Sequence, residues 1–322
     1  LYLTTSTGVE VITGLSASSY RDAGAPRALG PTYTLTGASG FLANSSQCAY
    51  RVLLVRTDAN SNILYGYPSE RLWVTNTAGG TRNVQLVCYL PAAAIAGDVI
   101  QIYRTKQLTG TSTDTAGDEE GLVYQATLTS SDISTKSITI TDQVDDTLIG
   151  ATIYTAPSQQ GISQANAEPP LVKDLALYKN TMFYANAQTK QRLYVSLIST
   201  TNLYNSGSYN RTVIIGGVTY TGKASENAAA GEFLVDGTSA AAVAIDVTAR
   251  SLVSVINRYS SNTSVYAYYL SDPSSLPGQI LIEARSLGAS PFTIQVGNSA
   301  TDRKSTRLNS SHVSESRMPS SA

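Results

Sequence analysis

Short runs of alternating apolar and polar residues dominate the first half of the chain. These runs are rich in β-branched and aromatic side chains, and Gly, Asn, Asp and Ser separate them at intervals typical of a sandwich. No helical period of useful length lies between them. The pattern predicts a mainly β chain that opens with an antiparallel β-sandwich over residues 1–155. The expected strands are 48–56, 71–76, 84–91, 99–104, 122–129 and 137–142.

A different rhythm follows a Pro-, Gln- and Asn-rich linker at 156–170. Three strand-like runs, 174–178, 181–185 and 192–199, are joined by a tight turn and a loop. A meander this short buries too little apolar surface to be stable alone. We therefore predict that 171–209 forms the first blade of a β-propeller, which is incomplete in this sequence.

Residues 210–300 combine strands with one helix, and we predict an α+β module inserted after the blade. Gly216-Gly217 lies between two apolar runs and indicates a two-residue hairpin. Asp246 is the expected N-cap of a helix. The apolar stripe of this helix should be buried, and it comprises Ala249, Leu252, Val253 and Ile256. The sheet beneath it should carry Val213, Ile215, Phe233, Ile280 and Ile282.

Residues 302–322, DRKSTRLNSSHVSESRMPSSA, follow neither pattern. The segment resembles the conceptual translation of a sequencing-library adapter, so we expect a non-native, disordered tail and a native fragment that spans 1–301. The segment holds four of the 22 basic residues and two of the 23 acidic ones, so the net charge changes from −1 to −3 without it. It also holds His312, the single histidine of the chain.

The absence of histidine from 1–301 excludes several chemistries from this fragment. A Ser-His-Asp or Cys-His nucleophile system, a histidine general base and a His-ligated zinc site all need that side chain. Cys48 and Cys88 are too few for a zinc site, and we expect buried free thiols, with a single disulfide as the alternative. The balanced charge and the lack of Lys/Arg runs argue against a protein that binds nucleic acid through its phosphates.

Two acidic loops have the residue types of cation sites without the spacing. Asp58, Asn60 and Asn62 imitate the start of a calcium loop, but Ser69 stands at the twelfth position in place of Glu, so a polar turn is expected. The second loop, 109–121, contains Asp114, Asp118, Glu119 and Glu120. These four carboxylates have no recognisable ligand spacing, and we expect a solvated loop, with a bound cation as the alternative.

Asp145 and Asp146 are adjacent at an apparent strand end, so their side chains should point to opposite faces. That arrangement is a poor general acid/base pair. We therefore assign no catalytic, cofactor-binding or metal-binding residue and expect no enzyme activity in this fragment.

The 20 tyrosines offer many ring faces. Those within strand patterns should be core or half-buried: Tyr103, Tyr124, Tyr178, Tyr184 and Tyr194. Those near turns and polar loops should be exposed: Tyr65, Tyr67, Tyr204 and Tyr209. Trp73, on a strand, is assigned to the core.

Several segments carry a resemblance to a known family. The fibronectin-III-like segment of bacteriophage tail proteins resembles YRVLLVRTDANSNILYGYPSE, DVIQIYRTKQ, GLVYQATL and ITDQVDDTLIGATIYT. The first propeller blade of tail nozzle or hub proteins is similar to PPLVKDLALYKNTMFYANAQTKQRLYVS. A small insertion of phage virion proteins resembles IIGGVTYTGKASENAAAGEF, TARSLVSVIN and GQILIEARSLG.

The resemblance implies a structural tail component, assembled in the host cytoplasm and located in the virion. Such proteins form rings with other tail or connector proteins around the axis along which DNA leaves, and they pass DNA without reading its sequence. No catalysis, cofactor or membrane span is implied. The alternative is a tail-fibre or cell-surface adhesin that binds host glycans through exposed tyrosines.

Overall fold

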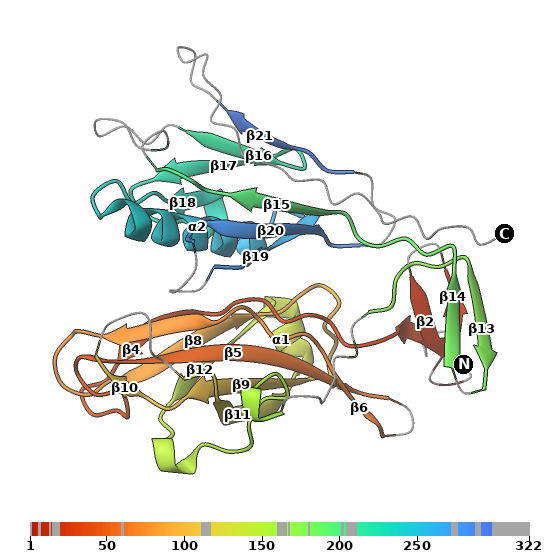
Figure 1. Ribbon diagram of the computed structural model, residues 1–322, viewed down its shortest axis with the longest axis horizontal. Helices are drawn as coiled ribbons and strands as arrows, with labels where there is room; N and C mark the ends of the chain where they lie inside the picture. The colour runs from red at the N-terminus through yellow and green to blue at the C-terminus, as the bar shows by residue number, and fades with distance from the viewer. Residues whose placement is uncertain are drawn as a thin grey trace. The chain divides into compact units, whose positions relative to one another are not determined.

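The described part of the chain is mainly β, and its strands pair antiparallel except for one parallel pair (Figure 1). The computed structural model describes residues 2–5, 8–12, 14, 20–58, 61–110, 117–159, 166, 168–179, 181–200, 203, 211–271, 276–286 and 291–297. It divides into two compact units, and the main boundary lies between Lys190 and Gln191. The predicted mainly β fold class is confirmed. The adapter-like segment, Asp114, Tyr204 and Tyr209 lie outside the described residues.

The first unit contains the predicted β-sandwich. One sheet is built on the long strand β5 and comprises β5 (Ser46–Thr57), β6 (Ile63–Tyr65), β7 (Leu72–Asn76), β9 (Val99–Thr105), β10 (Leu108–Thr109) and β11 (Glu120–Thr127). The other comprises β4 (Thr32–Thr36), β8 (Asn83–Tyr89) and β12 (Ser137–Asp142). Between β11 and β12 lies α1 (Ser130–Thr135), which the sequence analysis missed and which begins at a Thr129/Asp132 capping box.

Period-2 alternation explains the core of the sandwich. On β5, Cys48, Tyr50, Val52 and Leu54 are all buried in the same cluster as Leu86 on β8. Side chains at every second strand position share one face, so a twelve-residue strand supplies a long inward row. Burial of each large apolar side chain contributes about 1.5–3 kcal/mol. Cys48 and Cys88 belong to this cluster as free thiols, as expected.

The sandwich is shorter than the predicted 1–155 region, because the N-terminal residues form a sheet of their own. That sheet comprises β1 (Tyr2–Thr4), β2 (Val9–Ile12) and β3 (Tyr20–Asp22). Val9 and Ala23 share a small core with Val172 and Leu175, which lie beside and within the hairpin of β13 (Asp174–Tyr178) and β14 (Thr181–Ala185). Two segments about 150 residues apart in sequence therefore pack together.

The third strand of the predicted blade lies elsewhere. β15 (Arg192–Ser196) pairs with β20 (Gln279–Ala284) of the second unit, not with β14, so the three-stranded blade predicted over 171–209 is not formed by the described residues. Val195 lies opposite Ile280 and is buried in the core of the second unit. That burial provides apolar contacts that a three-stranded meander lacks.

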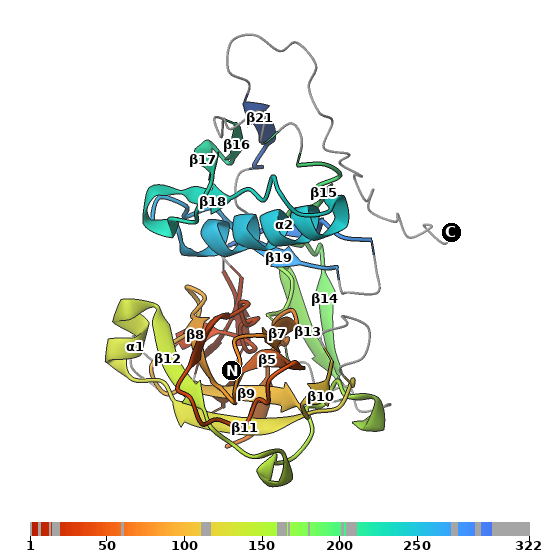
Figure 2. The same ribbon diagram turned by 90° about the vertical axis from the view of Figure 1, so that its left-hand side faces the viewer.

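The second unit contains two sheets and one long helix. Its three-stranded sheet is β15, β20 and β19 (Val265–Tyr269), and its four-stranded sheet is β16 (Thr212–Ile215), β17 (Val218–Lys223), β18 (Glu232–Leu234) and β21 (Ile294–Gly297). Helix α2 (Ala241–Arg258) contacts β18, β19 and β20, and Figure 2 shows it alongside β19. The predicted hairpin at Gly216-Gly217 is confirmed, and both glycines have positive φ. Short 3₁₀ turns are η1 (Asp146–Leu148) and η2 (Pro157–Gln159) in the first unit and η3 (Ala228–Ala230) in the second.

The predicted helix stripe and the predicted sheet residues share one core, which confirms that part of the analysis. The predicted helix start is wrong. Helix α2 begins at Ala241, because the alanine-rich run before Asp246 has high helix propensity and continues the helix upstream. Asp246 lies inside the helix, where its carboxylate accepts hydrogen bonds from Arg250 Nε (2.8 Å) and the Tyr269 hydroxyl (2.7 Å).

Candidate functional site

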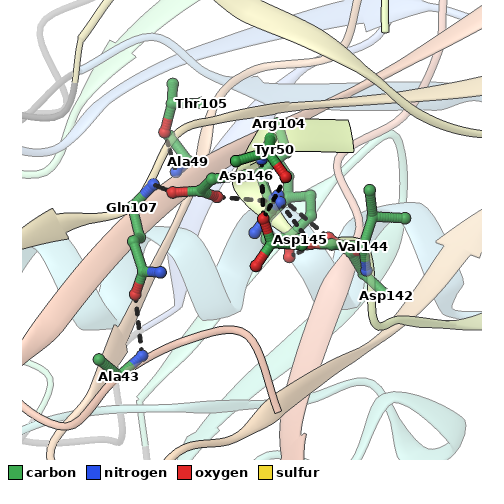
Figure 3. Close-up of polar contacts among 11 residues, drawn as sticks. Ala43, Ala49, Tyr50, Arg104, Thr105, Gln107, Asp142, Val144, Asp145 and Asp146 are labelled. Atoms are coloured by element: carbon green, nitrogen blue, oxygen red, sulfur yellow. Dashed lines mark hydrogen bonds and ion pairs between the residues drawn. The ribbon is translucent and has the colours of Figure 1, made fainter. Parts of the chain in front are cut away.

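A buried polar cluster of the sandwich is built on Arg104 (Figure 3). Arg104 follows Ile100 and Ile102 on the inward face of β9, and its side chain is fully buried. Its Nε lies 3.2 Å from Asp142 Oδ2 and its Nη2 lies 3.1 Å from Asp146 Oδ1. Nη2 also donates to the Val144 carbonyl at 2.8 Å. The guanidinium therefore ties β9 to the segment that leaves β12.

Tyr50 and Cys48 extend this cluster into the core. The Tyr50 hydroxyl donates to Asp142 Oδ2 at 2.8 Å. Burial raises the pKa of Asp142 against the opposing effect of Arg104, and burial also raises the pKa of the Tyr50 hydroxyl. Burial raises the pKa of the Cys48 thiol to about 12, so this thiol is protonated at neutral pH and is a poor nucleophile. The cluster therefore has the properties of a structural contact that holds strands of the sandwich together.

Asp145 and Asp146 point to different partners, in line with the predicted divergence. Asp145 is exposed and caps η1, accepting from the backbone N–H and the hydroxyl of Thr147. Asp146 instead accepts from the Gln107 N–H at 2.9 Å and pairs with Arg104. The pair begins a 3₁₀ turn, not the predicted strand end.

The acidic residues of the 109–121 loop that the structure describes bind arginine or serine, and Arg71 pairs with two of them. Glu120 is buried, and Arg71 Nε lies 2.7 Å from its Oε1. Burial raises the pKa of Glu120, while its arginine partners oppose that effect. Asp118 pairs with Arg71 Nη1 at 3.1 Å, and Glu119 accepts from the backbone and hydroxyl of Ser158. These contacts anchor the described part of the loop to the sandwich. Asp118 and Glu119 are nevertheless exposed, as expected for a solvated loop, whereas Glu120 is buried.

The described residues of the calcium-like sequence, Asp58 and Asn62, belong to a polar turn, whereas Asn60 lies outside the described residues. Both carboxylate oxygens of Asp58 accept hydrogen bonds from Asn62, one from its backbone and one from its side chain, each at 2.8 Å. In the described part of the chain, no three His, Cys, Asp or Glu side chains lie close enough together to hold a metal ion. Neither α-helix of the described residues has the length and apolar composition needed to cross a bilayer.

The exposure of the tyrosine side chains differs from the prediction on β13, β14 and β15. Tyr103 is buried and Tyr124 half-buried, as expected. Tyr178, Tyr184 and Tyr194 are instead exposed, with 62%, 45% and 39% of their surfaces accessible. Strand alternation places a side chain on a face, but that face is buried only when another element covers it.

The β13–β14 hairpin is the least covered pair of strands. Its register places Ala176 opposite Phe183 and Tyr178 opposite Thr181. The residues Ala176, Tyr178, Phe183 and Ala185 share one side and are all exposed, and we call this side the hairpin face. On the opposite side, Leu177 is also 67% exposed. Among the described strands, β14 pairs with β13 alone.

Two other aromatic assignments have definite outcomes. Tyr67 is 50% exposed, as predicted, whereas Tyr65 is half-buried, with its ring 6.0 Å from that of Tyr154. Trp73 is half-buried and, contrary to the prediction, is not part of the core. The Arg71 guanidinium lies 5.0 Å from its ring centroid.

The hairpin face and the Arg104 cluster escaped the sequence analysis for different reasons. Apolar residues occupy both faces of 174–178 and 181–185, a signal of an uncovered or shared ribbon that we interpreted as burial. The inward position of Arg104 could have been found from its alternation with Ile100 and Ile102.

Comparisons with protein-family models, with curated proteins and with solved structures find no match for this chain.

Proposed function

We propose that this chain is a structural subunit of a bacteriophage tail, of the nozzle or hub type, that assembles side by side into a ring. The observation that carries the proposal is the uncovered hairpin face. An isolated two-stranded ribbon is marginally stable, and a free strand edge beside exposed apolar side chains is suited to pairing with another chain. The tail-protein resemblance of the surrounding segments supplies the type of assembly.

Buried ion pairs in the first unit support a structural role for the sandwich. Arg104 and Glu120 are buried and ion-paired, and both lie within the sandwich. Such pairs specify one arrangement of the strands, because removal of either partner leaves a charge buried without compensation. In a tail, a rigid sandwich would keep the assembly surfaces of neighbouring subunits in register.

The charge of the chain is consistent with a conduit that releases DNA. Without the adapter-like segment the net charge is −3, and the sequence has no Lys/Arg run. A surface of this kind gives little counterion-driven affinity for duplex DNA. A measured affinity of the assembled protein for duplex DNA with a steep salt dependence would contradict this part of the proposal.

The second candidate is an adhesin that binds host glycans. Tyr20 and Tyr67 favour it, because both rings are at least half exposed in the first unit. Exposed aromatic faces stack on sugar rings, while the hydroxyl provides a polar contact.

One pair of double variants separates the two candidates. Tyr178→Ser with Phe183→Ser removes the large rings of the hairpin face, and the matched control, Tyr20→Ser with Tyr67→Ser, removes two exposed rings elsewhere in the same unit. We expect the hairpin variant to abolish ring assembly with neighbouring tail proteins, measured by mass photometry, and the control to retain it. Unchanged assembly of the hairpin variant, with glycan binding lost only in the control, would favour the adhesin.

A further inference from the structure

The guanidinium of Arg56 joins three segments of the first unit. Its Nε and Nη2 each lie 2.8 Å from one carboxylate oxygen of Asp98. Nη2 also donates to the Ala93 carbonyl at 2.8 Å, and Nη1 donates to the carbonyls of Gly24 at 3.1 Å and Asp22 at 3.5 Å. All three guanidinium nitrogens therefore have acceptors. The side chains of Arg56 and Asp98 are only 3% and 1% exposed.

This arrangement combines a sandwich ion pair with a contact to the N-terminal sheet. Arg56 continues the inward row of β5, and Asp98 directly precedes β9. Asp22 and Gly24 lie at the end of β3, where the chain leaves the small sheet of β1, β2 and β3, and they supply only backbone oxygens. The buried Arg56 thus binds the main chain that connects the small N-terminal sheet to the sandwich.

Other links between the small sheet and the rest of the first unit are present among the described residues. Arg21 Nη2 donates to the Thr57 carbonyl at 2.7 Å in an exposed position. The Ala25 N–H donates to the Asn166 carbonyl at 2.7 Å, and the Asn166 N–H donates to the Tyr65 carbonyl at 2.6 Å. The apolar core beside the small sheet contains few side chains. Such a sheet has little stability of its own, so its position depends on its attachments.

We infer that Arg56, Asp98 and the carbonyls of Asp22, Gly24 and Ala93 form a latch that holds the N-terminal sheet in one position on the sandwich. When the latch opens, the described strands of the N-terminal sheet separate from the sandwich together, while the two sheets of the sandwich stay folded. Opening breaks the hydrogen bonds from Arg56 to the three carbonyl groups and exposes its bidentate ion pair with Asp98 to water. The closed state is therefore stabilised by several hydrogen bonds that form together. The latch is a property of the first unit and does not depend on ring assembly.

Gly24 provides a way to open the latch without removing the ion pair. Its φ of +85° lies in the region that L residues with a Cβ rarely adopt. Gly24→Ala should therefore shift the local main chain and its carbonyl while Arg56 and Asp98 remain paired. Arg56→Lys is the complementary change, because lysine keeps the charge but lacks the planar fork that binds carboxylate and carbonyls together.

Hydrogen–deuterium exchange on the full chain tests the latch. The reporter is the N–H group of Ala25, which donates to the Asn166 carbonyl outside the small sheet. We expect both Arg56→Lys and Gly24→Ala to raise its exchange rate about tenfold or more, with unchanged rates in β8 of the far sheet. The Ala23 N–H donates to the Val9 carbonyl inside the small sheet, so its exchange rate should change less. The matched control is Arg82→Lys, since Arg82 also donates to two carbonyls but lies far from the N-terminal sheet in sequence and binds loop residues of the sandwich, Gly37 and Ala78.

Two outcomes of the exchange experiment would overturn the latch. If Gly24→Ala leaves the exchange of the Ala25 N–H unchanged, the carbonyl contacts do not hold the sheet and the latch is overturned. If Arg56→Lys accelerates exchange equally in β8 and in the N-terminal sheet, Arg56 is a general core contact, which also overturns it.

Discussion

At the scale of single residues, the charged side chains inside the sandwich follow the strand period. Arg56 continues the inward row of Val52 and Leu54 on β5, just as Arg104 continues the row of Ile100 and Ile102 on β9. Both arginines stand at the ends of apolar rows, where carboxylates from neighbouring segments reach them. The chain has few charged residues, and several of them are used to close the ends of the core.

Arg104→Met should destabilise the sandwich strongly. It leaves the buried Asp142 and the partly exposed Asp146 without their cation, and the expected loss is about 3–5 kcal/mol in the free energy of unfolding. Urea denaturation at pH 7 measures it. The control is Arg250→Met, which removes a partly exposed i,i+4 pair with Asp246 and should cost no more than about 1 kcal/mol. Equal losses in the two variants would show that the Arg104 cluster does not brace the fold.

Asp236 should make the second unit sensitive to acid. The pKa of its carboxyl is lowered from 3.8 to about 2, because the Ser239 hydroxyl and the backbone N–H groups of Thr238 and Ser239 donate to it. A lowered folded pKa contributes stability that is present above the unfolded value and lost as the pH falls through the folded one. Asp236→Asn keeps an acceptor oxygen without the charge. Thermal unfolding at pH 5 should show a deficit in this variant that closes by pH 2, and a deficit independent of pH would contradict the assignment.

At the scale of elements, strands were easier to predict than their partners. The runs that became β5, β8, β9 and β11 are visible from local alternation, and the stripe of α2 is visible from its 3.6-residue period. The run that became β15 was also recognised, but its pairing with β20, some 85 residues later, depends on a core that local pattern does not encode. The start of α2 was missed because Asp246 is a favourable cap residue that here bonds a neighbouring helix residue and Tyr269.

Helix α2 gives a matched test of core packing within one element. Ile256 is fully buried, whereas Val243 on the same helix is 53% exposed. Ile256→Ala should lower the free energy of unfolding of the second unit by about 2–5 kcal/mol, because it leaves a cavity as well as losing apolar burial. Val243→Ala should change it by less than about 0.5 kcal/mol. Similar effects in both variants, measured by chemical denaturation, would mean that the stripe does not face the core.

The pairing of β15 moves the boundary of the second unit and can be tested with two fragments. A fragment of 191–297 retains the strand that lies against β20, whereas a fragment of 208–297 lacks it and leaves one edge of β20 unpaired. We expect cooperative thermal unfolding of the longer fragment and a lower melting temperature, or no cooperative transition, for the shorter one. Identical melting of the two fragments would contradict the role of β15.

At the scale of the whole molecule, we propose that the chain is a subunit whose uncovered hairpin face contacts a neighbouring subunit. The sandwich and the second unit each have a well-buried core, whereas the β13–β14 hairpin exposes apolar side chains on both of its sides. Identical subunits that pair head to tail close into a ring when the rotation between them permits. The face predicted from sequence to be covered by further blades is, in this proposal, covered by an adjoining subunit.

Electron microscopy of the complete gene product, co-expressed with its neighbouring tail proteins, tests this claim most directly. We predict closed cyclic oligomers for the native protein, and their loss in the Tyr178→Ser, Phe183→Ser variant with no change in the melting temperature of either unit. A native protein that remains monomeric beside its tail partners, and is found instead at fibre tips bound to cells, would contradict the account and leave the adhesin in its place.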